Sequence, residues 1–336
     1  RNMLDISNSD AFGNLALTGK VNKLPFVPGQ AGRLGIFEEQ GVPVRTIVVE
    51  ERSGSLALIP NTAIGAPPNQ NVIGRRTVRS FIVPHHPLEA KVMASEVQGV
   101  RAFGGTELQA VEAKVQEHLQ EMSWKHDATL EYGRIGAIKG TILDANGSDT
   151  IYNLFTEFNI VQSSVDFVLG TSTTNIKSKT LEVVRVIETE LGQAPYDHIH
   201  CFAGKTWFDK FVSHDAVKAA YERWVGSSGA GDFLRADNRR GFPFAGVWFE
   251  EYRGAVGGVS FVADAEAHFF PVGVPGLFIT RYAPADTLEA ANTPGLPRYA
   301  MREMMEFGRG MKILTESNPL NLCTRPKVLV KGTTSN

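Results

Sequence analysis

Cysteine is scarce in this chain of 336 residues, and the two that occur, Cys201 and Cys323, lie far apart in the sequence. Each lies in a strand-like apolar run, so we interpret both as buried, reduced thiols. A disulfide between them stays open, because sequence alone does not give the distance between two Cα atoms. No CxxC or HExxH spacing occurs, and the usual framework of a zinc site is therefore missing.

Long apolar runs and a strong charge of one sign are missing as well. No stretch reaches about 18 apolar residues, so we expect no membrane-spanning helix, and no signal peptide is recognisable. The 34 Lys and Arg residues nearly balance the 36 Asp and Glu residues, which gives a formal net charge of −2. This balance argues against a broad nucleic-acid-binding surface. It also implies little self-repulsion, which permits dense association.

Motifs of catalysis are absent too. No GxSxG nucleophile signature occurs. The glycine-rich segment 226–231 has Asp232 where a phosphate-binding loop would carry lysine, so we interpret it as a surface loop. In a strand, His198 and His200 would share one face while Cys201 points to the other, so these side chains cannot converge on a metal ion. We therefore assign no catalytic, cofactor-binding or metal-binding residue.

The 33 glycines and 17 prolines indicate a turn-rich protein of mixed helix and strand. Residues 1–33 are polar and lack a clear period, which indicates a mostly extended arm. Residues 34–60 read as two strands, the second being a return strand over 56–59, and residues 75–83 alternate as an exposed strand does. Together, 43–84 predict a two-stranded protrusion with its tip near 66–72. It is either a flexible loop on a monomer or a ribbon that lies on a neighbouring subunit.

The clearest predicted helix covers residues 104–131. Thr106 and Gln109 form a capping-box pattern at its start. Its apolar residues follow the spacing of a single helix face: Leu108, Val111, Val115, Leu119 and Met122. We expect this face to pack on a hairpin with strands over 135–143 and 150–161, because an Asn-Gly turn at 146–147 separates two apolar runs.

The segment 166–300 reads as a second, mixed α/β module. Its expected elements are a helix over 180–191 capped by Thr180 and stopped by Gly192, a buried strand over 196–203, a helix over 214–225 capped by Ser213, a glycine-rich loop over 226–241, and short strands over 247–270. Strand-like segments at 311–316 and 327–330 are expected to return to the first module.

Three C-terminal segments carry a resemblance to a known family: PGLFITRYAPAD, NTPGLP and ESNPLNLCTRPKVLV. They resemble the C-terminal end of tailed-phage major capsid proteins of the lambda capsid protein E family. The segment LGIFEEQGVPVRTIVVEERSGSLALIP is similar to the family's lead into its extended loop. The segment IKGTILDANGSDTIYNLFTEFNI is similar to its peripheral-domain hairpin. The order of these segments along the chain gives the resemblance its specificity.

The resemblance implies an α+β fold of the Hong Kong 97 type. Its parts would be an N-terminal arm with the strand that follows it (1–42), an extended loop (43–84), a peripheral domain with the spine helix (85–165), an axial domain (166–300), and a return to the peripheral domain (301–336). It also implies a function as a structural protein rather than an enzyme. Such a major capsid protein assembles as hexamers and pentamers into an icosahedral shell enclosing double-stranded DNA.

The implied partners are other copies of the chain, scaffold, portal and decoration proteins, and packaged DNA through non-specific contact, with no membrane. The implied location is the virion, after assembly in the host cytoplasm. Candidate contacts between subunits are Pro67, Pro68, Arg75 and Arg76 in the extended loop, and Arg235, Arg239 and Arg240 in the glycine-rich loop. Two alternatives remain: an encapsulin-like compartment shell, and an α/β enzyme with an unrecognised site.

Overall fold

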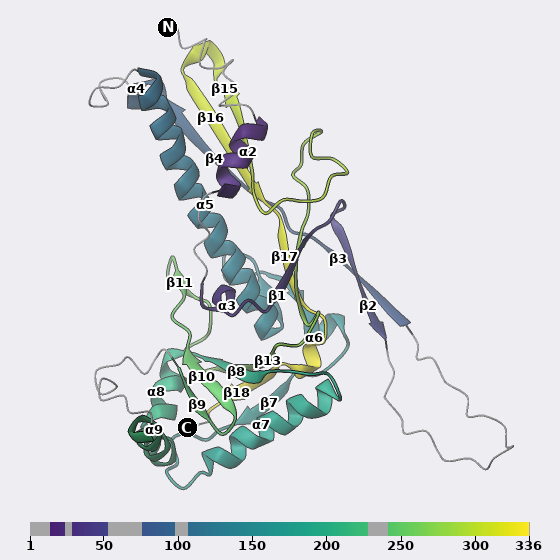
Figure 1. The fold of residues 1–336 in the computed structure, drawn as a ribbon, viewed down its shortest axis with the longest axis vertical. Helices are drawn as coiled ribbons and strands as arrows, with labels where there is room; N and C mark the ends of the chain where they lie inside the picture. The colour runs from purple at the N-terminus through teal and green to yellow at the C-terminus, as the bar shows by residue number, and fades with distance from the viewer. Residues whose placement is uncertain (1–13, 24–28, 53–75, 98–106, 228–240, 336) are drawn as a thin grey trace, which may run out of the picture.

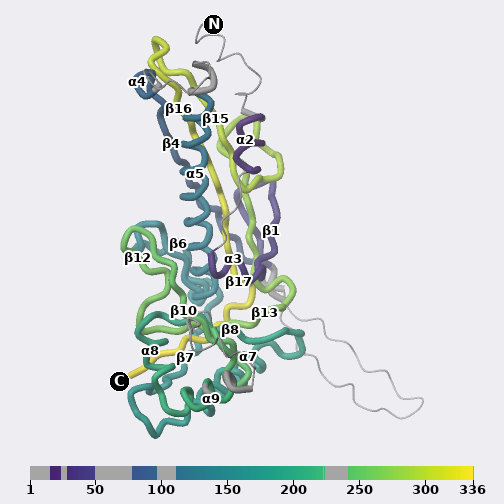
Figure 2. Tube along the Cα trace, turned by 60° about the vertical axis from the view of Figure 1, so that its left-hand side comes forward, coloured from purple at the N-terminus to yellow at the C-terminus, as the bar shows by residue number. Residues whose placement is uncertain are grey.

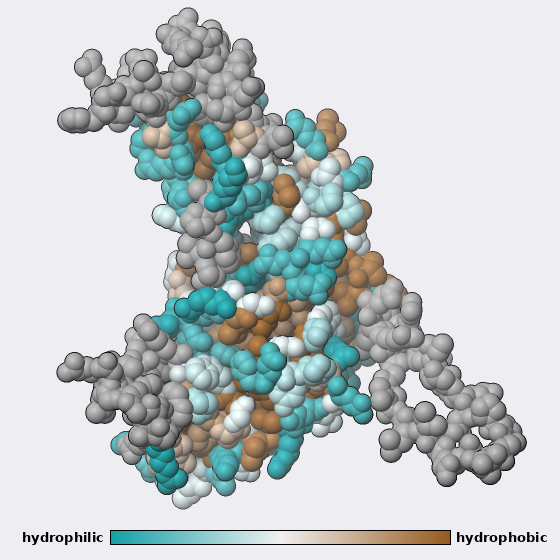
Figure 3. Space-filling view, in the orientation of Figure 1, coloured by the Kyte–Doolittle hydropathy of each residue, from teal (hydrophilic) through white to brown (hydrophobic). Residues whose placement is uncertain are grey.

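The computed structural model describes residues 14–23, 29–52, 76–97, 107–227 and 241–335 of an elongated molecule (Figure 1). A long helix, α5 (Glu107–Lys139), connects a narrow upper part to a lower part built around a six-stranded sheet. Figure 2, which views the molecule from a second direction, shows the upper strands running alongside this helix. Figure 3 shows hydrophilic and hydrophobic residues interspersed over the face that Figure 1 presents. The mixture of helices and sheets confirms the predicted α+β class.

Helix α5 is longer than predicted. It contains 33 residues, which corresponds to about 50 Å at 1.5 Å per residue. The prediction of a strand that begins at Ile135 is therefore wrong for residues 135–139, which form the end of the helix. Ile135 and Ile138 are both buried, and their spacing of three fits a helix face as well as an apolar strand. Gly140, with a φ of +78°, ends the helix before the short strand β5 (Thr141–Leu143).

The apolar face of α5 is buried as predicted, but against other partners. Val111, Val115, Leu119 and Met122 pack in one cluster with side chains of α2 (Asn14–Lys23) and of a three-stranded sheet. That sheet contains β15 (Tyr299–Met304), β16 (Gly310–Ser317) and β4 (His86–Met93). The side chain of Leu108 lies outside the described residues. The arm is also not extended throughout, because α2 forms part of it.

The hairpin expected to cover α5 is small. Strand β5 pairs with β6 (Thr150–Asn153), and the chain then enters α6 (Leu154–Glu157) instead of continuing as a strand. The side chain of Asn153 accepts hydrogen bonds from the backbone N–H groups of Phe155 and Thr156, which caps α6. A capping asparagine therefore ends this strand well before the predicted residue 161.

The six-stranded sheet has the order β7-β18-β13-β8-β10-β9. Its strands are β7 (Ser163–Asp166), β18 (Val330–Thr333), β13 (Ala267–Val272), β8 (His198–Ala203), β10 (Val247–Glu251) and β9 (Phe242–Phe244). Helices α7 (Ile176–Leu191), α8 (Lys205–Ser213) and α9 (Asp215–Ser227) lie against it. Trp207 and Phe211 of α8 stack with Phe249, and together they fill the aromatic core beneath the sheet.

Two predicted helix caps in this lower part are wrong. Helix α7 begins at Ile176, where Asn175 accepts a hydrogen bond from the N–H of Ser178. Thr180 lies inside the helix and donates its hydroxyl to the carbonyl of Ile176. Ser213 ends α8, a helix that the sequence analysis did not predict, instead of capping α9. Gly192, with a φ of +65°, does end α7 as predicted.

A second three-stranded sheet has the order β1-β14-β17. Its strands are β1 (Phe37–Gly41), β14 (Phe278–Tyr282) and β17 (Pro319–Cys323). At the chain's end, β16 returns to the upper part as expected. Strand β18 instead pairs with β13 and β7 of the lower sheet, so the expected return to the first module is wrong for this segment. The remaining short elements are α3 (Gln30–Arg33), α4 (Ala94–Val97), β11 (Ala255–Val256), β12 (Val259–Ser260), η4 (Glu306–Gly308) and η5 (Pro326–Val328).

The predicted protrusion begins as a two-stranded antiparallel ribbon of β2 (Thr46–Arg52) and β3 (Arg76–Ile82). Figure 1 shows it leaving the body at an angle to the long helix. The expected return strand at 56–59 and the expected tip at 66–72 lie outside the described residues. The described strands confirm that the protrusion starts as a ribbon.

Candidate functional site

The inner face of the ribbon anchors it to the body. Ile47, Val49 and Phe81 are buried there, as strand alternation requires for residues on one face. The Phe81 ring meets Tyr152 edge-on at 5.3 Å between centroids and stacks on Phe158 at 6.3 Å. The hydroxyl of Tyr152 also bonds both the N–H and the C=O of Ile82. These contacts fix the direction in which the ribbon leaves the body.

The outer face of the ribbon is apolar and exposed. Val48, Val78 and Ile82 lie on this face with exposed fractions of 55%, 59% and 64%, and Val44, two residues before β2, is 53% exposed. We call these four residues the outer ribbon face. Within the described residues, β2 and β3 pair only with each other, so beyond the base each strand keeps an edge that another strand can use. An exposed apolar face beside open strand edges is typical of an interaction surface.

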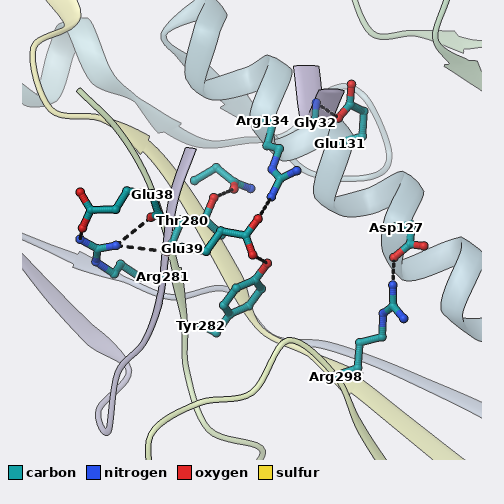
Figure 4. A network of polar contacts seen from close by, with 11 residues as sticks. Gly32, Glu38, Glu39, Asp127, Glu131, Arg134, Thr280, Arg281, Tyr282 and Arg298 are labelled. Atoms are coloured by element: carbon teal, nitrogen blue, oxygen red, sulfur yellow. Dashed lines mark hydrogen bonds and ion pairs between the residues drawn. The ribbon is translucent and has the colours of Figure 1, made fainter. Parts of the chain in front are cut away.

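The second feature is a row of charged residues on α5 (Figure 4). Asp127, Glu131 and Arg134 are four and three residues apart, so they lie on one side of the helix. Asp127 pairs with Arg298, and Arg134 pairs with Glu39. Each pair joins α5 to a segment more than 90 residues away in the sequence. These contacts hold the upper and lower parts in one arrangement.

Glu131 and Glu39 each connect several segments. Glu131 accepts the backbone N–H groups of Ala31 and Gly32 at 2.7 and 3.0 Å. Glu39 accepts a 3.0 Å hydrogen bond from the hydroxyl of Tyr282, and Figure 4 shows Arg134 and Tyr282 pointing at it from two sides. Burial raises the pKa of Tyr282, so its phenol remains a donor. Both carboxylates already accept hydrogen bonds from the protein. The charged row on α5 is therefore a structural joint rather than a catalytic centre.

A groove of about 760 Å³ lies between α5, α3 and β11. Trp124, which is 53% exposed, and the buried carboxylates Asp127 and Glu131 are among its lining residues. Both carboxylates are engaged in the joint described above. Besides apolar surface, the lining of the groove includes Arg33 and Arg253.

The lower sheet carries a second polar cluster. Glu266 lies 3.5 Å from His268 and 2.6 Å from Lys331. The hydrogen bond with His268, followed by that with Lys331, lowers the pKa of Glu266 to about 2. Burial lowers the pKa of His268, which is therefore held neutral near pH 7. This cluster joins β13 to β18 across the sheet.

The remaining sequence expectations concern metal and redox chemistry. Cys201 and Cys323 are buried free thiols, as predicted, and burial raises the pKa of both. His200 lies 3.4 Å from Glu250 on one side of β8. Across the described ranges, no three potential ligands gather into a metal-binding group. No helix in the described part of the chain combines the length and apolarity needed to span a bilayer.

Six of the seven predicted contact residues lie outside the described residues: Pro67, Pro68, Arg75, Arg235, Arg239 and Arg240. Arg76 begins β3, where only its backbone pairing with Arg52 is described. The ribbon was predicted from the sequence, but the outer ribbon face was not. The alternation of TIVVEER and RTVRSFI carried that signal, because it leaves apolar residues on both faces of the ribbon.

Comparison of the sequence with known proteins supports the fold described above. The family model described as phage major capsid protein E matches residues 15–334. The major capsid protein of Pseudomonas phage KPP10 is 32% identical over 337 residues, which cover 94% of this chain and 95% of that protein.

Solved structures show the same fold. A crystal structure attributed to a prophage capsid protein of E. coli CFT073 matches with a TM-score of 0.57 and 11% identity, covering 96% of this chain and 99% of that one. The mature capsid of bacteriophage PhiM1 matches with a TM-score of 0.52 and 11% identity, covering 89% and 85%. These matches confirm the Hong Kong 97-type capsid fold.

Proposed function

Because this chain belongs to the phage major capsid protein E family, we propose that it assembles as hexamers and pentamers into an icosahedral shell enclosing double-stranded DNA. Members of this family are structural capsid proteins and not enzymes, and they belong to the capsid of the virion. Assembly takes place in the host cytoplasm.

The outer ribbon face is the observation that supports self-assembly most strongly. Three of its four apolar residues lie on the ribbon and Val44 lies just before it, and their side chains are exposed in the described part of one subunit. An isolated two-stranded ribbon is only marginally stable in water. A neighbouring subunit can cover the apolar face and pair with an open strand edge, which offsets this cost.

The domain assignment forms part of the proposal. Residues 43–84 act as the extended loop, α5 as the spine of a peripheral domain over 85–165 with a return at 301–336, and 166–300 as the axial domain. Within this scheme β18 contributes to the axial sheet, since it pairs with β13. Scaffold, portal and decoration proteins are further partners, and packaged DNA is contacted without sequence specificity.

Two groups of residues are proposed to contact neighbouring subunits. Pro67, Pro68, Arg75 and Arg76 belong to the extended loop. Arg235, Arg239 and Arg240 alternate with acidic residues in the glycine-rich loop, so copies around a capsomer axis can pair opposite charges. Each exposed pair contributes only about 0–1 kcal/mol, but a ring repeats it at every subunit. Charge reversal of Arg239 and Arg240 together should lower capsomer yield most at low salt, where screening is weak.

Sedimentation velocity on the purified chain, with and without co-expressed phage scaffold, tests the proposed function. We expect capsomers or closed particles at high protein concentration, and nuclease-protected DNA only in particles formed during phage infection. Particles that package host enzymes instead of DNA would favour a compartment shell over a phage capsid. A monodisperse monomer under every condition would contradict the proposal.

A further inference from the structure

The groove between α5, α3 and β11 adjoins a second hollow. This hollow has a volume of about 500 Å³ and shares four lining residues with the groove, namely Trp124, Ala128, Val256 and Phe261. Trp124 and Val256 are both more than half exposed. An exposed tryptophan beside a connected apolar hollow is typical of a surface that receives an apolar side chain of a partner.

The charge that this groove offers to a partner is positive. Its two carboxylates are buried and already engaged in the joint on α5. Glu121 and Lys125 of the second hollow pair with each other at 2.7 Å. The arginines Arg33 and Arg253, in contrast, are both exposed. The groove is therefore complementary to an apolar side chain that has acidic neighbours.

The loop between β14 and β15 carries such a side chain. Leu288 is 98% exposed. Asp286 and Glu289, on either side of it, are exposed as well. We call residues 286–289 the acidic loop. An apolar side chain that is almost fully exposed between two carboxylates matches both the shape and the charge of the groove.

Hydrogen bonds hold the acidic loop in one conformation. The N–H of Asp286 donates to Oε2 of Glu316 at 3.0 Å. The N–H groups of Ala290 and Ala291 donate to the carbonyl of Thr287 at 3.2 and 3.1 Å. The Ala290 side chain is buried in a small apolar cluster at the base of the loop. Leu288 is therefore displayed on a fixed support, which reduces the entropy lost when it packs against a partner.

We propose that the acidic loop of one subunit docks in the groove of a second copy of the chain. Leu288 enters between Trp124 and Val256, and the two carboxylates of the loop face the two exposed arginines of the groove. This inference rests on the proposed function, because it assigns a specific contact between subunits of the shell.

The positions of the two surfaces favour a second copy as the occupant. Figure 1 shows the loop between β14 and β15 on the right of the molecule and β11 on the left, and Figure 2 also shows them on opposite sides. The loop therefore cannot reach the groove of its own subunit. A contact between different surfaces of identical chains is head-to-tail, and it generates a ring when the rotation closes. Capsomers of five and six subunits are rings of this kind.

Substitution of Leu288 separates folding from assembly. Leu288→Asn changes an exposed side chain, so the urea midpoint of the unassembled subunit should stay unchanged. The protein concentration that gives half-maximal assembly should rise about tenfold or more, as expected for loss of an apolar anchor. Val161→Asn is the matched control, because Val161 is 91% exposed between α6 and β7 and should assemble as wild type. Normal assembly of Leu288→Asn would contradict the docking.

Cysteine crosslinking identifies the occupant. A disulfide requires two Cα atoms within about 7 Å, and the native thiols, Cys201 and Cys323, are buried and do not compete. Mild oxidation of particles that carry both Val256→Cys and Leu288→Cys should give a covalent ladder that ends at five and six subunits. A mixture of the two single variants should stop at covalent dimers, because each chain can then form one disulfide only.

The other outcomes separate this contact from the proposed function. Particles of the double variant that form but stay uncrosslinked would contradict the docking alone. Covalent dimers of Leu288→Cys by itself would show that two acidic loops meet each other, which would also contradict it. A wild-type chain that never assembles would contradict the docking and the proposed function together.

Discussion

The hydroxyl of Tyr252 donates a 2.9 Å hydrogen bond to Oε1 of Glu131, and this bond joins the lower part of the molecule to the long helix α5. The same oxygen accepts the N–H of Ala31, and Oε2 accepts the N–H of Gly32. A Cβ at Gly29 would lie 2.2 Å from Cδ of Glu131, so the arm can approach this carboxylate only with glycine there. One buried carboxylate thus holds three segments together.

Replacement of Glu131 should loosen this joint. Glu131→Gln keeps the size of the side chain but replaces one acceptor oxygen with an NH₂ donor facing other donors. We expect the unfolding free energy to fall by roughly 1–3 kcal/mol, the cost of buried groups left without partners. Tyr252→Phe removes a single bond and should cost about 1 kcal/mol. Urea denaturation of the unassembled subunit measures both, and a Glu131→Gln midpoint equal to wild type would refute the joint.

Truncation on the apolar face of α5 should destabilise the subunit. Leu119 is 2% exposed and packs with α2 and the β15–β16–β4 sheet. Leu119→Ala should lower the unfolding free energy by roughly 2–5 kcal/mol, the range for buried leucine. Lys125→Ala on the exposed side of the same helix loses only an i,i+4 pair with Glu121 and should change it by less than about 0.5 kcal/mol. Equal thermal stability of the two variants would show that the face is not buried.

Apolar spacing predicted the first half of α5 and the ribbon, because both patterns depend on neighbours within a few residues. It failed at Ile135 and Ile138, where the apolar spacing fits both a helix and a strand. It also failed at α8, a short helix rich in aromatic residues. The joint on α5 could not be predicted. Arg134 and Glu39 are 95 residues apart, and Arg298 and Asp127 are 171 apart. Only the folded chain brings such partners together.

Charge on the outer ribbon face should block assembly but not folding. Ile82→Lys and Val48→Lys place an ammonium group where the exposed side chain has water around it in the free subunit. Their unfolding free energies should stay within about 0.5 kcal/mol of wild type, as is usual for surface substitutions. Their particle yield should drop sharply, because a neighbour would have to desolvate the charge.

The opposite face of the ribbon supplies the control. Phe81 is 1% exposed, and Phe81→Ala should lower the unfolding free energy by roughly 3–5 kcal/mol. Urea denaturation should therefore show the lower stability for Phe81→Ala. Light scattering should show the loss of particle yield for Ile82→Lys and Val48→Lys, although these two variants remain stable. Full particle yield from Ile82→Lys would remove the outer ribbon face from the assembly contacts.

Acid should lower the unfolding free energy of the subunit because of His126. Burial, reinforced by the positive charge of Arg298, lowers the pKa of His126 to about 4. In the unfolded chain its pKa is about 6.5. Between these values the unfolded chain binds a proton that the folded chain does not. The unfolding free energy should therefore fall as pH drops from about 6.5 to 4, by up to about 3 kcal/mol.

A variant and a second pH window test this assignment. His126→Gln cannot titrate and can still bond Thr315, so its stability should fall less steeply over the same range. Below about pH 4.5, Glu266 should add a further loss, because the unfolded chain binds a proton there that the folded chain, with a pKa of about 2 for this carboxyl, does not. Urea midpoints measured from pH 7 to pH 3 resolve both windows. An unchanged slope for His126→Gln would assign the acid sensitivity to other groups.

Self-assembly of the purified chain is tested most directly by electron microscopy of particles, with light scattering on the same samples across protein concentration. We expect closed particles built from five- and six-subunit capsomers, with the β2–β3 ribbon of each subunit lying on a neighbour. Uniform small species at every concentration, with scaffold present or absent, would contradict a shell-forming function.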